Sequence, residues 1–143
     1  MPRSGQTLCS AESLTAGMIS STLAFVAGSS DVLRGGVVSY ASEVKHEVLD
    51  VDASLLEKQG PVDASVASQM ALGVAKTLNA HNAVAVTGIA GPGGGSVEKP
   101  VGTVWIALKT PKKSFVSCYH FSGERMDVRK KTTYTALKLL LDI

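Results

Sequence analysis

The pattern of apolar and polar positions predicts strands and helices that alternate along most of the chain. Some segments carry apolar residues at helical spacing, as Met18, Ile19, Leu23 and Val26 do, whereas others are short and rich in β-branched residues. The predicted strands cover residues 6–10, 35–41, 83–86, 103–109 and 115–121. The predicted helices cover residues 12–30, 42–49, 53–59, 63–79 and 124–141.

Polar residues and glycines at the boundaries support these assignments. Ser13 or Thr15 can cap the helix after the first strand, and Ser42 can cap the next helix. Asp63 stands at the start of the longer helix, which ends at about residue 79. Gly28 suits the left-handed backbone position that follows a helix end.

The order of the elements predicts the fold class. Strands alternate with helices until residues 103–121, which form a hairpin-like pair of strands. The strand at 83–86 is entirely apolar, as a strand at the centre of a sheet would be. We therefore expect a single α/β domain over residues 1–143, with three layers (α/β/α) and a mixed, mostly parallel sheet.

The composition is that of a globular domain, with 143 residues of which 45% are hydrophobic and 18% charged. The formal net charge of +2 does not indicate a nucleic-acid surface, and the basic cluster at 125–131 fits a solvated helix face. No apolar run approaches the roughly 20 residues of a membrane span, and the first ten residues lack a hydrophobic stretch of signal-peptide length. These features predict a cytoplasmic protein that binds neither nucleic acid nor membrane.

The cysteines and histidines predict neither a disulfide nor a metal site. Cys9 and Cys118 both fall in predicted strands, where we expect reduced, buried thiols. The three histidines show no metal-ligand spacing with either cysteine.

Polar side chains gather after three of the predicted strands. In open α/β sheets, ligands bind beyond the carboxyl ends of the strands. The loops at these ends carry six polar side chains of interest, namely Ser13, Thr15, Tyr40, Ser42, Lys45 and Thr87. Three such loops together predict a binding or catalytic site.

The residue types in these loops favour a serine that is activated by a lysine. The loops contain no histidine, so they do not supply a Ser-His-Asp arrangement. Lys45 falls in the first turn of its helix, where burial and the positive end of the helix dipole would both favour a neutral amine that can act as a base. Ser42 and Lys45 also match the S-x-x-K spacing of serine acyl enzymes, but the pattern is short and Ser42 has a sufficient role as a cap. A solvated surface lysine is the alternative.

Residues 86–102 form a glycine-rich segment directly after the central strand. This segment lacks the G-K-[ST] ending of a P-loop, but its backbone N–H groups can form a concave site for an anion or an oxyanion. Arg125 and Arg129 are spaced i and i+4 on one helix face and could bind a phosphate. The alternatives are a permissive surface loop with Glu98 and Lys99 solvated, and an ordinary surface stripe of arginines.

Four motifs of the chain resemble a known family, namely AESLTAG, GSSDVLRGGVVSYASEVK, TGIAGPGGGSVEKPVGTVW and FSGERMDVRKKT. They are similar to the C-terminal domain of the competence/damage-inducible CinA proteins, which also occurs alone as nicotinamide mononucleotide deamidase. The resemblance covers nearly the whole chain. It implies hydrolysis of the carboxamide of nicotinamide mononucleotide to nicotinic acid mononucleotide and ammonia, a step of pyridine nucleotide salvage. It further implies a homo-oligomer that needs no metal and no cofactor.

The resemblance also implies roles for individual residues. By position, Ser13 matches the serine that attacks the amide, Lys45 the lysine that activates this serine, and Tyr40 a tyrosine of the same pocket. The residues implied in substrate binding are Thr15, Thr87, Gly88, Ala90, Gly91, Arg125 and Arg129. One of the two arginines is expected to meet the phosphate.

The chain departs from the family motif ESCTGG, because Leu14 replaces the cysteine and Ala16 the first glycine. The cysteine is therefore not needed as a nucleophile, whereas Ala16 could crowd a close approach of the backbone. Ser42 stands where the family has asparagine, which argues against Ser42 as the nucleophile. The rival hypothesis is a non-catalytic module that binds a nucleotide or a partner protein.

Overall fold

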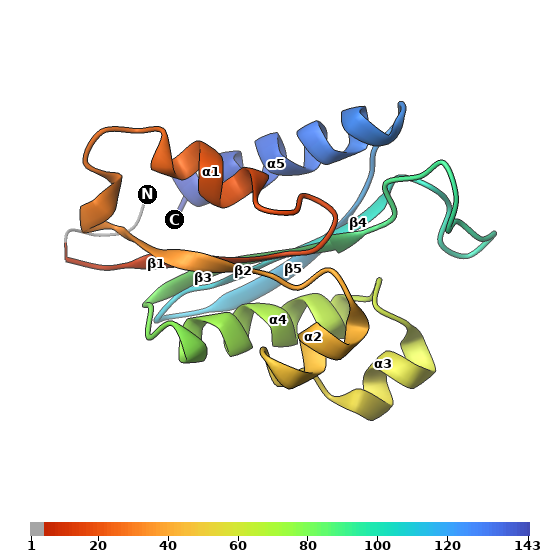
Figure 1. The fold of residues 1–143 in the computed structure, drawn as a ribbon, viewed down its shortest axis with the longest axis horizontal. Coiled ribbons are helices and arrows are strands. Elements are labelled where there is room, and N and C mark those ends of the chain that lie inside the picture. Colours follow the sequence, from red (N-terminus) through yellow and green to blue (C-terminus); the bar gives the residue numbers. More distant parts are fainter. Residues whose placement is uncertain (1–4) are drawn as a thin grey trace.

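A five-stranded sheet forms the centre of the computed structural model, which describes residues 5–143 (Figure 1). The spatial order is β2-β1-β3-β4-β5, where β1 is parallel to β2 and β3, and β4 is antiparallel to both of its neighbours. β4 alone therefore runs against the other four strands, and the expected mixed, mostly parallel sheet is confirmed. The strands are β1 (Leu8–Glu12), β2 (Leu33–Val38), β3 (Asn82–Gly88), β4 (Thr103–Lys109) and β5 (Ser114–His120).

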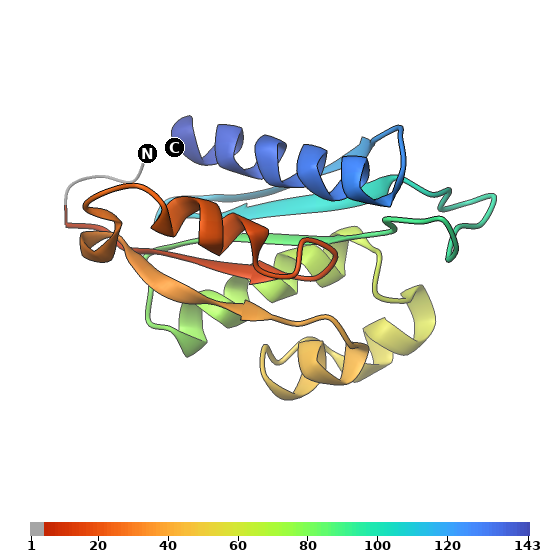
Figure 2. The same cartoon turned by 45° about the horizontal axis from the view of Figure 1, so that its top comes forward.

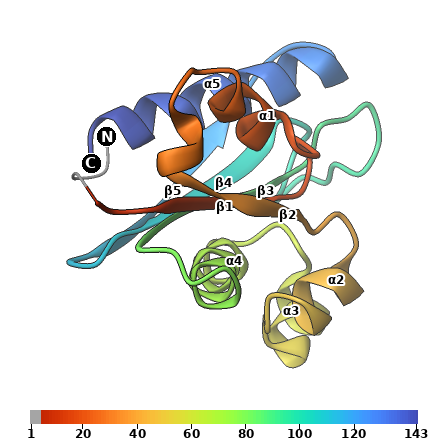
Figure 3. The ribbon, with the colours of Figure 1, turned by 60° about the vertical axis from the view of Figure 1, so that its left-hand side comes forward.

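Helices cover both faces of the sheet. They are α1 (Met18–Ala24), α2 (Ser42–Glu47), α3 (Ala53–Gln59), α4 (Ala64–Thr77) and α5 (Arg125–Leu141), with a short 3₁₀ helix, η1 (Ser29–Asp31). α1 and α5 lie on one face, and α4 lies on the other with α2 and α3 beside it (Figure 3). The three-layer α/β/α arrangement predicted from the order of elements is confirmed. No helix within residues 5–143 is both long and apolar enough to cross a membrane.

Each face of the sheet carries its own hydrophobic core. In β1, Leu8 belongs to the core under α1 and α5, whereas Cys9 and Ala11 belong to the core over α4. The two sets separate because successive side chains of a strand point to opposite faces. In β3 every residue from Asn82 to Thr87 is buried, as expected for a strand that is covered on both faces.

The first predicted helix is wrong in its extent. The pattern places it over residues 12–30, but Glu12 still belongs to β1, α1 ends at Ala24 and η1 follows. The left-handed backbone expected at Gly28 is present, with φ 87°, yet this glycine precedes η1 and does not end α1. The first two strands also begin and end a few residues away from their predicted bounds.

The predicted helix caps are correct at one helix and wrong at two. Neither Ser13 nor Thr15 caps α1, whose N-cap position is Gly17. Ser42 is already the first helical residue of α2, and no side chain makes a capping hydrogen bond there. Asp63 caps α4 as predicted, because its side chain accepts hydrogen bonds from backbone N–H groups of the first turn.

Both cysteines are free thiols, but only one is buried. Burial raises the pKa of the Cys9 thiol to about 12, so this thiol stays protonated. Cys118 is exposed, which contradicts the prediction of two buried thiols. The reason is its place on β5, an edge strand of the sheet.

The fold brings three chain segments to one edge of the sheet. The carboxyl ends of β1, β2 and β3 meet there, because these strands are parallel neighbours. The segments that leave them are residues 13–17, 39–41 and 89–102. The glycine-rich segment projects beyond the sheet at this edge (Figure 2).

Candidate active site

A pocket of about 430 Å³ opens at this edge of the sheet. Residues from distant parts of the chain line it, from the turn after β1 to the start of α5. The sequence-predicted residues along its wall are Ser13, Tyr40, Lys45, Thr87, Gly88, Ala90, Gly91 and Arg125. The structure therefore brings together most of the residues that the sequence predicts for one site.

Lys45 reaches the pocket from α2, and only 1% of its surface is exposed. Its Nζ lies 3.0 Å from Ser13 Oγ, 2.7 Å from the Ser39 carbonyl oxygen and 3.1 Å from the Tyr40 carbonyl oxygen. The alternative of a solvated surface lysine is thereby excluded. Because none of these three partners is charged, little compensates the ammonium form for its loss of water.

Burial lowers the pKa of Lys45 to about 8, from an ordinary value of 10.5. A substantial fraction of this side chain is therefore neutral near pH 8, and only the neutral amine can accept a proton. Burial is the cause of the shift. The predicted contribution of the helix dipole is wrong, because Lys45 lies in the last turn of the six-residue α2 and not at its positive end.

Ser13 extends the line of β1 and is held through its backbone. Its N–H donates to the Val86 carbonyl of β3 at 3.1 Å, and its carbonyl accepts from the Ala16 N–H at 3.1 Å. The side chain lies in the pocket with 8% of the residue exposed. The Ser13 N–H is already paired, so it does not serve an oxyanion.

Glu12, which was not predicted from the sequence as a functional residue, organises the turn that carries Ser13. Its carboxylate is buried, with 1% of the residue exposed, and accepts five hydrogen bonds of 2.7–3.1 Å. The donors are the hydroxyls of Ser10 and Thr15 and the backbone N–H groups of Gly17, Ile19 and Ser20. An acidic residue between a buried strand and a helix start was the available signal, since the first N–H groups of a helix attract a carboxylate.

Tyr40 and Arg125 meet at the exposed side of the pocket. The Arg125 guanidinium donates to the Tyr40 hydroxyl and to the Gly91 carbonyl, both at 2.8 Å. These contacts join the start of α5 to the segment after β2 and to the glycine-rich segment. A guanidinium has five N–H groups, so two such contacts leave donors for a ligand.

The glycine-rich segment forms a closely packed wall of the pocket. The Thr87 hydroxyl donates to the Pro61 carbonyl at 2.8 Å, which fixes the connection between α3 and α4 against β3. Gly91 has φ 85°, and a Cβ atom there would lie 2.5 Å from the Val101 side chain. Glycine is required at this position both by the backbone conformation and by the close approach.

Three of the residues considered from the sequence do not line the pocket. The buried Thr15 hydroxyl donates to Glu12, and Arg129 donates through Nε at 2.8 Å and through a terminal nitrogen at 3.4 Å to two carbonyls of the turn after β1. The structure gives Thr15 and Arg129 internal partners in place of the pocket positions expected for them. Ser42 lies in α2, and the lysine of its S-x-x-K pattern contacts Ser13 instead.

Lys99 and Ser39 are further residues near the site that no sequence motif predicts as functional. Lys99 is half-buried and lines the pocket, and its Nζ donates to the Gln59 carbonyl at 2.5 Å, so its side chain is not fully solvated. The Ser39 hydroxyl is buried, and no hydrogen-bond partner for it occurs among the described residues. The Lys99 contact joins residues 40 positions apart, which no local pattern reveals.

The charges along the pocket are all positive. Lys45, Lys99 and Arg125 line it, and no aspartate or glutamate of the described residues does. Within residues 5–143, no three histidine, cysteine, aspartate or glutamate side chains cluster in a way that could hold a metal ion. This one-sided charge favours an anionic ligand.

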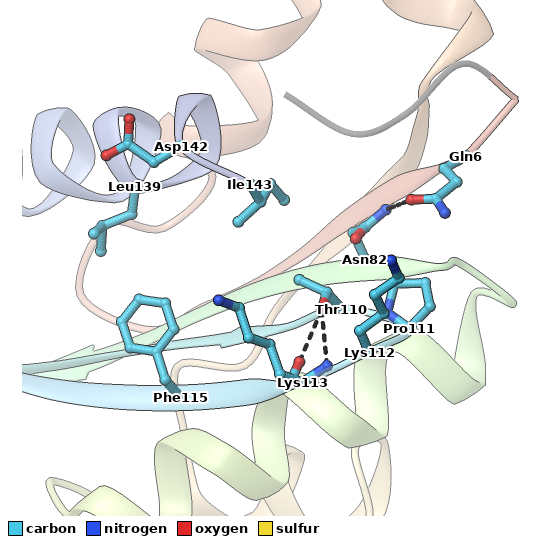
Figure 4. A pocket seen from close by; sticks show the side chains of 10 residues that line it. All are labelled: Gln6, Asn82, Thr110, Pro111, Lys112, Lys113, Phe115, Leu139, Asp142 and Ile143. Carbon is cyan, nitrogen blue, oxygen red and sulfur yellow. Dashed lines mark hydrogen bonds between the residues drawn. The ribbon is translucent and has the colours of Figure 1, made fainter.

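A second cavity, of about 460 Å³, lies at the opposite end of the sheet (Figure 4). Phe115, Leu139 and Ile143 lie on one side of it, and Gln6 and Asn82 on the other. None of the residues predicted for the site from the sequence lines this cavity. The pocket that contains Ser13 and Lys45 is therefore the candidate active site.

Comparison with known proteins finds relatives that are similar over nearly the whole chain. The chain is 45% identical over 136 residues to a CinA-like protein of Desulfotalea psychrophila, and 47% identical over 138 residues to one of Microcystis aeruginosa. These alignments cover 95% and 94% of this chain but 33% of each relative, so the chain spans a third of the length of these relatives.

Solved structures and a family model give the same relationship. The competence/damage inducible protein CihA of Agrobacterium tumefaciens has a TM-score of 0.94 and 41% identity, covering 96% of this chain and 85% of that one. The competence damage-inducible protein A (ComA) of Klebsiella pneumoniae has a TM-score of 0.91 and 33% identity, covering 95% and 84%. The model of the CinA C-terminal domain matches residues 1–143. The chain therefore belongs to the CinA C-terminal domain family.

Proposed function

We propose that this domain is a serine amidase that hydrolyses the carboxamide of nicotinamide mononucleotide, with Ser13 as nucleophile and Lys45 as base. The observation that carries the proposal is the 3.0 Å distance between Lys45 Nζ and Ser13 Oγ in a buried setting. The positive lining of the pocket supports a substrate that bears a phosphate. The family resemblance supports the choice of the pyridine mononucleotide.

The three partners of Lys45 Nζ favour transfer of a proton from the Ser13 hydroxyl to the neutral Lys45 amine. A neutral primary amine has two N–H groups and one lone pair. Two of the three partners are the carbonyl oxygens of Ser39 and Tyr40, which can only accept hydrogen bonds. They take the two N–H groups, and the lone pair is left for the hydroxyl of Ser13.

The reaction follows from this arrangement in two halves. Ser13 Oγ attacks the carboxamide carbon while its proton moves to Lys45 Nζ, and the same proton then passes to the departing nitrogen, which leaves as ammonia. Water next gives a proton to Lys45 and attacks the ester carbon. Ser13 leaves with the proton from Lys45, and nicotinic acid mononucleotide is released.

The negative oxygen of the tetrahedral intermediate needs backbone donors. The N–H groups of Ser13 and Ile89 are already paired, with Val86 and Thr103 respectively. Ala90 and Gly91 line the same pocket, and their N–H groups are the candidates for this role. Loss of one good oxyanion donor costs on the order of 10²-fold in rate.

The test is the release of ammonia from nicotinamide mononucleotide by the full chain, compared between wild type, Ser13→Ala and Ser39→Ala. Ser13→Ala should lose nearly all turnover and still bind the mononucleotide. Ser39→Ala is the matched control, because only the carbonyl of Ser39 contacts Lys45 and it should stay active. Mass spectrometry should locate the trapped acyl group on Ser13.

Any one of three results would overturn the proposal. A near-normal rate in Ser13→Ala, or an acyl group on Ser42, would assign the nucleophile elsewhere. Tight binding of the mononucleotide by wild type without release of ammonia would favour the non-catalytic nucleotide-binding module.

A further inference from the structure

Two cations of the pocket lining remain after the proposed chemistry has used Lys45. The Lys45 amine has three oxygen partners within the protein, so it has no N–H donor left for the phosphate of the substrate. Arg125 and Lys99 belong to different walls of the pocket. Arg125 comes from α5 beside Tyr40, and Lys99 comes from the glycine-rich segment beside Gln59.

We propose that Lys99 joins Arg125 as a second cationic ligand of the substrate phosphate, and that it makes the site selective for phosphorylated over unphosphorylated pyridine nucleosides. This inference rests on the proposed function. No carboxylate of the described pocket lining competes for the ammonium group. The group has three N–H donors, and the Gln59 carbonyl takes one of them.

The backbone around Lys99 holds the side chain in place before a ligand binds. The Ser96 N–H donates to the Lys99 carbonyl at 2.8 Å, and the Lys99 N–H donates to the Ser96 hydroxyl at 3.0 Å. Together with the contact to Gln59, these bonds fix both ends of the residue. A side chain that is ordered in advance loses less conformational entropy on binding, so its contact contributes more to affinity.

A purely structural role is the competing explanation for Lys99. α3 ends at Gln59, and a lysine that donates to the last carbonyl of a helix is a C-terminal cap. This role predicts a loss of stability when Lys99 is replaced, but no preference between ligands with and without phosphate. The two explanations therefore differ in a measurable ratio.

The experiment measures the binding of nicotinic acid mononucleotide and of nicotinic acid riboside by calorimetry. Neither probe carries the carboxamide, so affinity is read without turnover, and the two differ only by the phosphate. Lys99→Met should weaken binding of the mononucleotide about 10- to 100-fold, the size expected for a charge-assisted hydrogen bond, and leave the riboside unchanged. Lys99→Arg should retain most of the affinity. Lys58→Met, which removes an exposed lysine of α3 outside the pocket, should match wild type for both probes.

An equal loss of affinity for both probes in Lys99→Met, or no loss for either, would overturn the inference and leave only the capping role. Failure of the amidase proposal gives a different result. In that case the mononucleotide would still bind in a Lys99-dependent manner, but no ammonia would be released from nicotinamide mononucleotide. The two proposals are therefore tested separately.

Discussion

At the scale of the residue, Lys45 sets the pH dependence of the proposed reaction. Burial lowers its pKa to about 8, and only the neutral amine accepts the Ser13 proton, so turnover should rise with pH through about 8 and level off above it. Lys45→Arg should lose nearly all turnover at every pH, since a guanidinium keeps its proton. Initial rates between about pH 6 and about pH 10 test this expectation. A flat profile, or substantial activity in Lys45→Arg, would show that the lysine is not the base.

Ala16 is a second residue whose effect follows from its own conformation. It has φ 50°, a left-handed backbone that costs a residue other than glycine roughly 1–2 kcal/mol. Ala16→Gly should therefore raise the free energy of unfolding, by about 0.5–1 kcal/mol once the greater chain entropy of glycine is subtracted. Ala16 is exposed and does not line the pocket, so it does not crowd the ligand and activity should not change. Denaturant unfolding that shows equal or lower stability would contradict this account.

At the scale of the element, the turn between β1 and α1 depends on one carboxylate. Five donors converge on Glu12, and an amide at this position would offer one accepting oxygen and an NH₂ group that cannot accept. Glu12→Gln should lower stability by roughly 3 kcal/mol, because buried N–H groups lose their partner. Since the turn carries Ser13, kcat should fall while KM stays nearly constant. Glu57→Gln, an exposed change on α3, is the control and should leave stability and kcat unchanged. A change in KM with kcat unaltered in Glu12→Gln would argue against a positioning role.

The elements were predictable from the sequence where local patterns determine them. The apolar run of β3 and the cap at Asp63 are read directly, because period and side-chain type act over a few residues. The start of α1 was not predictable in this way. There Glu12 replaces a local cap, and its effect depends on how β1 and α1 pack together. The same holds for the candidate site. Ser13 and Lys45 were predicted from motifs and lie in contact, whereas the position of Lys99 depends on a long-range contact.

At the scale of the whole molecule, α5, the last helix of the chain, contributes contacts to the edge of the sheet that carries the candidate site. Its two arginines make different contacts at the same edge of the sheet. Arg125 contacts Tyr40 and the glycine-rich segment along the pocket, whereas Arg129 donates to carbonyls of the turn after β1, more than a hundred residues earlier in the chain. The two residues were equivalent in the sequence, and only the assembled fold distinguishes them.

This difference predicts separate kinetic effects for the two arginines. On the proposal that Arg125 contacts the substrate phosphate, Arg125→Met should raise KM for nicotinamide mononucleotide about 10- to 100-fold, because a charge-assisted contact is lost. The KM for nicotinamide riboside, which lacks the phosphate, should not change. Arg129→Met should lower stability by about 1–2 kcal/mol and reduce kcat for both substrates equally, because the turn that holds Ser13 loses its support. Steady-state kinetics on both substrates, with unfolding measured in parallel, separates the two patterns. If Arg129→Met instead raised KM for the mononucleotide alone, Arg129 would contact the phosphate, and its side chain would have to leave the two carbonyls on binding.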